Sequence, residues 1–247
     1  MLATLRRRLP SIVLCSPLLA LALTLAPSGA RSQSASQLDH AYQTELQADN
    51  EALRARIQQL PPAMQELNAQ VSAALRAGDR QQAQRLGEEM ARMDPRNADV
   101  LLFLGKLQGQ QGNAAAAQDL IDQSIKLNPD NKWAYINKAG AQAERSDLPN
   151  ALATTQELTR RFPDWSIGYN LQASLLDAMD REAQALSAYQ KAVAAKPASA
   201  LILTNMGNLQ RRLGRLSDAR LSYEQALRLQ PGYPLAESEL NLSLIHI

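Results

Sequence analysis

Hydrophobic residues recur with helical spacing in blocks that each contain a break. In residues 200–233 one apolar stripe precedes Gly214, and a second stripe follows it and ends before Pro231. The apolar positions of these two stripes are Leu203, Met206, Leu209 and Leu213, then Ala219, Tyr223, Ala226 and Leu227. Apolar residues three or four positions apart mark one face of an α-helix. The block therefore predicts two helices joined by a short turn.

The same block returns at an interval of 34 residues, as between Pro61 and Pro95. Prolines keep this interval at Pro61, Pro95, Pro129, Pro163, Pro197 and Pro231, and alanines keep it at Ala83, Ala117, Ala151, Ala185 and Ala219. A fixed period of 20–50 residues is the signature of a solenoid or array. We therefore predict five helical hairpins, at 64–97, 98–131, 132–165, 166–199 and 200–233.

The ends of the predicted helices have identifiable physical causes. The recurring prolines end each second helix because the proline ring clashes with the preceding turn. Turns are expected at Gly78, Gly112, Ser146 and Gly214, and N-caps at Asn97, Asn131, Ser166 and Ser199. Small residues in one phase, at Gly105, Ala139, Ala173 and Gly207, allow the two helices of a hairpin to approach closely. We therefore expect leucine at Ala185 or Ala219 to overpack the hairpin.

These blocks resemble tetratricopeptide repeats, whose motif combines a bulky residue, Leu-Gly, Ala, an aromatic residue and a closing Pro. The clearest matches are Leu203, Met206, Gly207, Ala219, Tyr223 and Pro231, and Tyr169, Ala173, Ala185, Tyr189 and Pro197. Blocks 64–97 and 132–165 match less well, with Gly87 and Thr155 where an aromatic residue is usual. The resemblance implies an all-α fold, a right-handed superhelical α-solenoid of antiparallel helix-turn-helix repeats.

Residues 1–30 have the order of features found in a secretory signal peptide. Three arginines at 6–8 precede a mostly apolar run over 12–26, and small residues follow up to Ala30. We expect cleavage after Ala30 and a periplasmic or secreted mature protein. A single-span membrane anchor is the alternative, but the run is short for a spanning helix and Pro17 interrupts it.

Removal of the signal changes the charge of the chain. The full sequence has 26 Lys and Arg and 24 Asp and Glu, and the signal contains three of the arginines and the single Cys. The mature chain therefore has one more acidic than basic residue and has no Cys. A near-neutral chain without a basic stripe gives no support for nucleic-acid binding. A mature protein without Cys is compatible with an oxidising compartment outside the cytoplasm.

The segments that flank the repeats are less regular. We expect a linker and an N-terminal helical cap over 31–63. The seven-residue spacing of Leu46, Leu53 and Leu60 also fits a short coiled coil, so oligomerisation through 38–60 is the alternative. Residues 234–241 begin a sixth repeat. Residues 242–247 resemble a translated sequencing-library adapter, which we interpret as a scar rather than a genuine apolar tail.

The sequence offers little for catalysis. His40 is the only His outside 242–247, and the mature chain has no Cys. No paired-His zinc motif occurs, and Gly105-Lys106 lacks the glycine spacing and hydroxyl of a phosphate-binding loop. We therefore predict that the protein is not an enzyme and uses no metal or other cofactor.

In tetratricopeptide repeats the first helices line a concave groove that binds peptides, so the resemblance implies binding residues on those helices. Asn137, Asn205 and Asn208 could clamp a peptide backbone, since an amide offers donors and an acceptor. Cationic candidates for an acidic ligand group are Lys106, Arg211 and Arg212, and Trp133 with Ile136 could add an apolar patch. The alternatives are solvent-exposed polar residues and packing between repeats.

Together these features predict an exported, non-enzymatic scaffold that binds partner peptides or proteins in a concave groove. We expect the double substitution of Asn205 and Asn208 by alanine to weaken partner binding without lowering stability. The alternative function is the N-terminal periplasmic arm of a larger envelope or polysaccharide-export machine. This second hypothesis depends only on the similarity of the expected fold to the repeat-rich arms of such machines.

Overall fold

The structure is a computed structural model that describes residues 38–245. The expected signal peptide and the linker over 31–37 lie outside the described residues. Over 38–245 the chain forms α-helices and no strand, apart from one isolated bridge between Trp165 and Lys196. The predicted all-α architecture of helix-turn-helix repeats is therefore confirmed.

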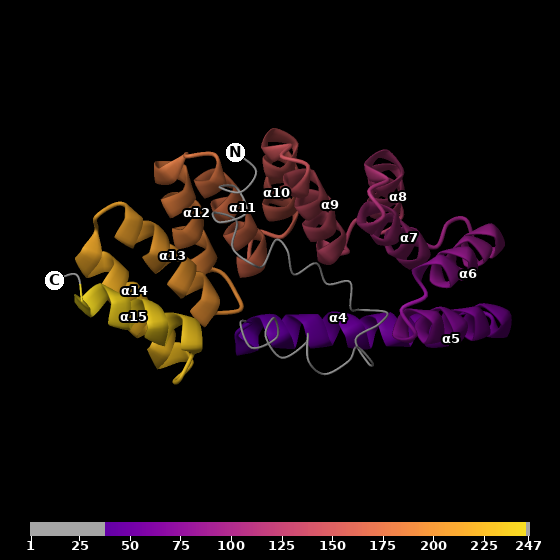
Figure 1. Ribbon diagram of the computed structural model, residues 1–247, viewed down its shortest axis with the longest axis horizontal. Helices are drawn as coiled ribbons and strands as arrows, with labels where there is room; N and C mark the ends of the chain where they lie inside the picture. The colour runs from indigo at the N-terminus through magenta and orange to yellow at the C-terminus, as the bar shows by residue number, and fades with distance from the viewer. Residues whose placement is uncertain (1–37, 246–247) are drawn as a thin grey trace. The chain divides into compact units, whose positions relative to one another are not determined.

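Each predicted block contains two helices (Figure 1). Their bounds are α4 (His40–Gln58), α5 (Pro62–Arg76), α6 (Arg80–Met93), α7 (Ala98–Gln110), α8 (Ala114–Leu127), α9 (Lys132–Glu144), α10 (Leu148–Arg161), α11 (Ser166–Ala178), α12 (Glu182–Ala194), α13 (Ala200–Arg212), α14 (Leu216–Leu229) and α15 (Pro234–Ile245). Pairs of successive helices pack together in the hairpins α5/α6, α7/α8, α11/α12 and α13/α14.

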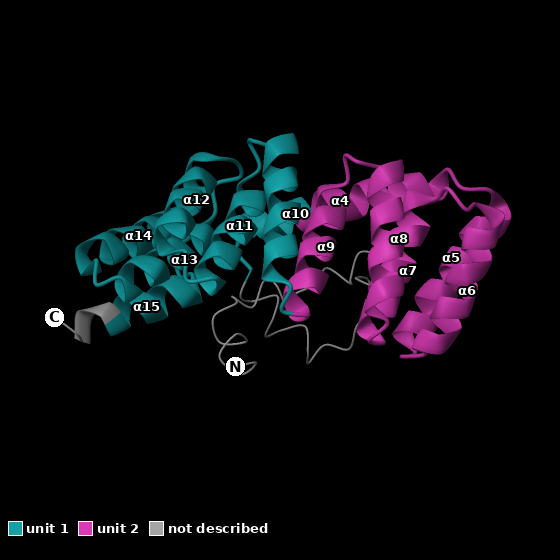
Figure 2. Ribbon diagram, turned by 90° about the horizontal axis from the view of Figure 1, so that it is seen from above, with its two compact units in different colours: residues 1–15, 29–45, 146–247 teal, residues 16–28, 46–145 magenta. Residues whose placement is uncertain are grey.

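The described chain divides into two compact units (Figure 2). Unit 1 contains residues 38–45 and 146–245, so it holds the start of α4 together with α10 to α15. Unit 2 contains residues 46–145, which form the rest of α4 and the helices α5 to α9. The chain therefore passes from one unit into the other within α4.

Each turn inside a repeat contains one residue with a positive φ angle. These residues are Gly78 (77°), Gly112 (84°), Ser146 (63°), Asp180 (57°) and Gly214 (73°). Gly adopts this conformation readily, and Asp and Ser can be held there by the surrounding turn. Asp180 was not recognised in the sequence because no Gly marks that turn. Pro149 lies in the first turn of α10, where its missing N–H costs little.

Three of the four expected N-caps are confirmed. Asn97, Asn131 and Ser199 each accept a hydrogen bond from a backbone N–H in the first turn of the following helix. The prediction for Ser166 is wrong, because the N-cap of α11 is Trp165 and Ser166 is the first helical residue. The Ser166 hydroxyl instead donates to the Pro197 carbonyl at 2.7 Å, and its N–H donates to the Lys196 carbonyl. Contact with the segment that follows α12 in the same repeat therefore replaces the local cap.

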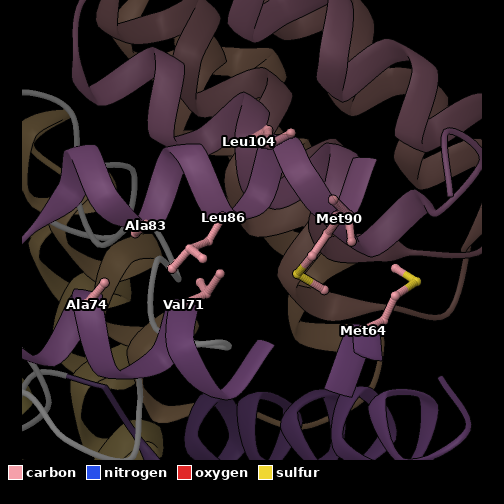
Figure 3. Packing of buried hydrophobic residues seen from close by; sticks show 8 residues of the cluster. Met64, Val71, Ala74, Ala83, Leu86, Met90 and Leu104 are labelled. Atoms are coloured by element: carbon pink, nitrogen blue, oxygen red, sulfur yellow. The ribbon is translucent and has the colours of Figure 1, made fainter. Parts of the chain in front are cut away.

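The hairpins close because small residues lie where two helices approach. A Cβ atom on Gly207 would lie 2.5 Å from Cε1 of Tyr223, and one on Gly105 would lie 2.8 Å from Cγ1 of Ile121. In unit 2 the core of the first hairpins combines residues of α5, α6 and α7 (Figure 3). The residues of this core are Met64, Val71, Ala74, Ala83, Leu86, Met90, Val100 and Leu104.

Candidate functional site

The three asparagines predicted to clamp a peptide already have partners in the fold. The Asn137 amide donates to the Trp133 carbonyl in its own helix at 2.7 Å, and both side chains are buried. Asn208 accepts a hydrogen bond from the Tyr223 hydroxyl of the same hairpin at 2.8 Å. Asn205 donates to the Oδ1 atom of Asn170 at 3.1 Å. The structure therefore brings Asn205 into a polar network between neighbouring repeats.

The three predicted cations lie in different settings. Arg211 pairs with Glu239 at 3.2 Å, and Arg212 pairs with Asp177. Lys106 is in unit 2 and half-buried, and its desolvation lowers its pKa to about 8 although Asp49 opposes the shift. The two arginines in unit 1 are thus neutralised by carboxylates, which leaves no basic clamp formed by this pair.

The start of α4 contacts the first helices of unit 1 through a buried chain of polar side chains. The Asn170 amide on α11 donates to the Tyr42 hydroxyl at 2.8 Å, while its oxygen accepts from Asn205 on α13. Tyr42 and Asn170 are 2% and 1% exposed. Burial, followed by the negative charge of Asp39, raises the pKa of Tyr42 well above its usual value. The tyrosine is therefore a neutral hydrogen-bonding group at this contact.

The carboxylate of Asp39 lies at the N-termini of two helices. One oxygen accepts from the N–H of Tyr42 at 3.1 Å and so caps α4, while the other accepts from the N–H of Leu201 in α13 at 3.2 Å. Asp39 is 1% exposed. The unpaired N–H groups and the dipole of a helix N-terminus favour a negative charge there. These two helix ends account for the burial of a carboxylate in this position.

Two more hydrogen bonds complete the contact between α4 and the rest of unit 1. The Glu45 carboxylate accepts from the indole N–H of Trp165 at 2.7 Å. The backbone N–H of His40 donates to the side-chain oxygen of Gln230 at 3.0 Å. Asp39, Tyr42 and Glu45 are three residues apart, a spacing that places side chains on one face of a helix. This face meets the unit 1 first-helix face, which we define by Trp165, Asn170, Leu201 and Asn205.

In unit 2 the remainder of α4 contacts the first helix of another repeat. Arg56 forms a bidentate ion pair with Asp99 of α7, with distances of 2.7 and 3.0 Å. This hydrogen bond is the main reason why the pKa of Arg56 is raised. Beside the pair is a pocket of about 360 Å³. Its lining combines apolar side chains such as Leu53 and Phe103 with the polar groups of Arg56, Arg96, Asn97 and Asp99.

Sequence reasoning missed the central residue of the unit 1 site. Asn137 and Asn205 share the phase of the 34-residue period over two repeats, whereas Asn170 lies one position out of that phase. The available signal was the three-residue spacing of Asp39, Tyr42 and Glu45 at the start of the segment 38–60. Trp133 was predicted to bind the ligand. It is 9% exposed and is one of the buried residues of α9.

Within residues 38–245 no group of three or more His, Cys, Asp and Glu side chains could hold a metal ion. No helix in the same part of the chain combines the length and hydropathy needed to cross a bilayer. The chemistry available at the unit 1 first-helix face is hydrogen bonding by buried amide, indole and backbone N–H groups. Such a face is suited to recognising a polypeptide segment.

Successive helical hairpins whose first helices hold another helix define a repeat protein of the α-solenoid class. Sequence profiles of the tetratricopeptide repeat match residues 74–126 and 110–175, 168–199 and 200–233. Since these matches together extend from residue 74 to residue 233, the chain belongs to the tetratricopeptide repeat family.

Comparison with known proteins gives relatives that share part of this chain. It is 29% identical over 131 residues to cellulose synthase operon protein C of Pseudomonas fluorescens, a match covering 50% of this chain and 10% of that protein. It is 28% identical over 127 residues to the human mitochondrial import receptor subunit TOM70, covering 49% and 21%. The chain therefore spans only a small part of these curated relatives.

A similar fold occurs among solved structures. The structure of MamA from Desulfovibrio magneticus RS-1 aligns with a TM-score of 0.57 at 20% identity, covering 70% of this chain and 99% of that one. At this identity the likeness concerns the fold alone. It agrees with the helix-turn-helix repeats described above.

Proposed function

We propose that this protein is an exported, non-enzymatic scaffold that binds a protein partner on the first helices of its repeats. The observation that carries the proposal is the hydrogen-bonded chain from Asn205 through Asn170 to Tyr42. Here two adjacent first helices already hold a helical segment by side-chain amides. Family membership supports the same role, because stacked repeats create extended binding surfaces.

The polar groups on this face favour selective binding. A buried amide or indole N–H that loses its partner leaves a desolvated polar group, which costs about 1–3 kcal/mol. A segment that lacks hydrogen-bonding groups at the positions of Tyr42 and Glu45 would leave Asn170 and Trp165 unsatisfied. The face therefore discriminates by the hydrogen-bonding pattern of its ligand as well as by shape.

The test is crosslinking of the exported protein in its native host, followed by identification of the captured partner by mass spectrometry. Replacement of Asn205 by alanine should reduce capture severalfold, because it removes an amide from the network on α13. Asn208→Ala is the matched control on the same helix, since its hydrogen bond to Tyr223 stays within the hairpin. Thermal unfolding of both variants checks for loss of stability. Equal capture by the parent protein and Asn205→Ala would reject this site.

Export is the second part of the proposal. Its support is the order of arginines, apolar run and small residues over 1–30. Expression with the native N-terminus in a Gram-negative host should give a periplasmic protein that begins at Arg31, as determined by intact mass. A protein in the cytoplasmic fraction that retains its first 30 residues would contradict export by a cleaved signal.

A second candidate function is the repeat arm of a larger polysaccharide-export machine. The observation that favours it is the similarity to cellulose synthase operon protein C, of which this chain matches only a tenth. Sequencing of the intact gene and its neighbours would test it. A downstream domain or adjacent genes for polysaccharide synthesis would support this function, whereas an unrelated gene neighbourhood and a stop codon after the sixth repeat would contradict it.

A further inference from the structure

The first turns of α4 are bound to unit 1 by contacts that are remote in sequence. Glu45 and Trp165 are 120 positions apart, Tyr42 and Asn170 are 128 apart, and Asp39 and Leu201 are 162 apart. In a solenoid each repeat contacts its neighbours, so contacts of this range are not needed to stack the repeats. Residues 38–45 therefore resemble a bound ligand more than a structural repeat.

We infer that the unit 1 first-helix face recognises a helical segment of the pattern Asp-x-x-Tyr-x-x-Glu, and that residues 38–45 occupy it as an intramolecular ligand. The inference rests on the proposed function, because it names the chemistry of the partner that this face binds. An external partner carries the same three groups on a helix and displaces the start of α4 when it binds.

Each of the three ligand groups has its own complement on unit 1. The acidic group binds at the N-terminus of α13, where the N–H of Leu201 donates to it and has no acceptor within the helix. The tyrosine hydroxyl meets the Asn170 amide, and the glutamate meets the indole of Trp165, which is 3% exposed. A partner without these groups would leave buried donors unpaired, so it would compete poorly with the chain's own segment.

The covalent connection gives the chain's own segment a large advantage. A tethered ligand has an effective concentration in the millimolar range when its linker allows binding. A free peptide of the same sequence, with a dissociation constant in the micromolar range, should therefore bind the parent at least about tenfold more weakly than a variant whose α4 has been released. This difference is the measurable consequence of an intramolecular ligand.

The experiment uses the full mature chain and a fluorescein-labelled peptide of residues 38–50. The released variant carries Asp39→Ala and Tyr42→Ala. Thr44→Ala is the control, because Thr44 is exposed on the same helix and its hydroxyl bonds only to the His40 carbonyl. Fluorescence anisotropy should show at least tenfold tighter peptide binding by the released variant, and equal binding by Thr44→Ala and the parent. Equal affinity for all three proteins would overturn the inference.

Tryptophan fluorescence gives a readout that does not depend on the added peptide. Trp133→Phe leaves Trp165 as the single tryptophan, since the chain has two. In this background the released variant should show red-shifted emission, because Trp165 loses the cover of Glu45, and the peptide should reverse the shift. Tyr42→Phe keeps the ring and removes the hydroxyl, so its shift should be intermediate. Circular dichroism confirms that each variant is folded, and unchanged Trp165 emission in a folded released variant would overturn the inference.

The remaining outcomes separate this inference from the proposed function. Partner capture that requires Asn205, combined with no gain in peptide affinity on release, would reject the inference and leave the proposed function standing. Partner capture that does not depend on Asn205 would reject the proposed binding site, and the inference with it. A parent dimer that dissociates on Tyr42→Ala, detected by light scattering, would show that the ligand comes from a second copy and would overturn the intramolecular assignment.

Discussion

At residue scale, the size of a few side chains determines how closely two helices approach. The predicted phase of small residues has a direct cause in the structure, since a methyl group on Gly207 would clash with the ring of Tyr223. Ala185 and Ala219 are fully buried in the second helices of their hairpins, and both are 0% exposed. These positions are restricted by packing, whereas the exposed Ala183, two positions before Ala185, is not.

We expect Ala185→Leu to lower the free energy of unfolding by about 1–3 kcal/mol, because three added carbon atoms overpack the hairpin of α11 and α12. Ala183→Leu on the same helix is the matched control, because Ala183 is exposed. Urea unfolding followed by circular dichroism measures both. Equal stabilities for the two variants would contradict the packing role of Ala185.

The lowered pKa of Lys106 predicts a dependence of stability on pH. Its folded-state pKa of about 8 is below the value of about 10.4 for an unfolded chain. Between these values the unfolded state binds more protons, so the free energy of unfolding rises with pH. Stability of the parent relative to Lys106→Met should therefore increase between pH 7 and pH 10, by at most about 1.4 kcal/mol per pH unit. If urea unfolding gives a difference in free energy between the parent and Lys106→Met that stays constant across this range, the lowered pKa of Lys106 is refuted.

At the scale of single helices, local signals determine where each helix begins and ends. Prolines two residues after α6, α8 and α10 end these helices as expected, and positive φ angles mark the turns within the hairpins. The prediction failed at Ser166, where a contact with Lys196 and Pro197 after α12 replaced the local cap. Local sequence therefore determined most helix ends, and a contact between the two ends of one repeat decided the exception.

Asn131 is the cap for which we expect the largest local effect. It accepts from the N–H groups of both Trp133 and Ala134, so Asn131→Ala should lower the free energy of unfolding by about 0.5–2 kcal/mol. Asn113 has the same position before α8 but makes no capping hydrogen bond. Asn113→Ala should therefore lower the free energy of unfolding by less than Asn131→Ala. Thermal and urea unfolding compare the two variants. A greater loss from Asn113→Ala would show that these caps have no such role.

At the scale of the whole molecule, most contacts join helices that are neighbours in the chain. In such an array the effects of a local change decline with distance along the repeats. Ala185→Leu should therefore speed amide exchange mainly in α11, α12 and α13, and should leave α5 and α6 unchanged. Hydrogen exchange measured by mass spectrometry tests this. Uniform acceleration over all the described helices would indicate a single cooperative unit instead.

The start of α4 is the exception to this nearest-neighbour rule. Its contacts with Trp165, Asn170 and Leu201 bring together segments that no local pattern relates. Asn205 was predicted as a binding residue, but its partner Asn170 was not, because Asn170 lies outside the phase of the repeat. The predicted candidates Asn208, Arg211 and Arg212 instead have partners within unit 1.

By itself, the sequence determined the helical class, the length of the repeat and most helix boundaries of this protein. It could do so because apolar spacing, turn residues and prolines act over a few positions and recur at a constant interval. Only the tertiary structure decided which polar groups meet at the first helices and which segment they hold. Those contacts depend on where side chains point after the repeats have stacked, and a period counted along the chain carries no information about that.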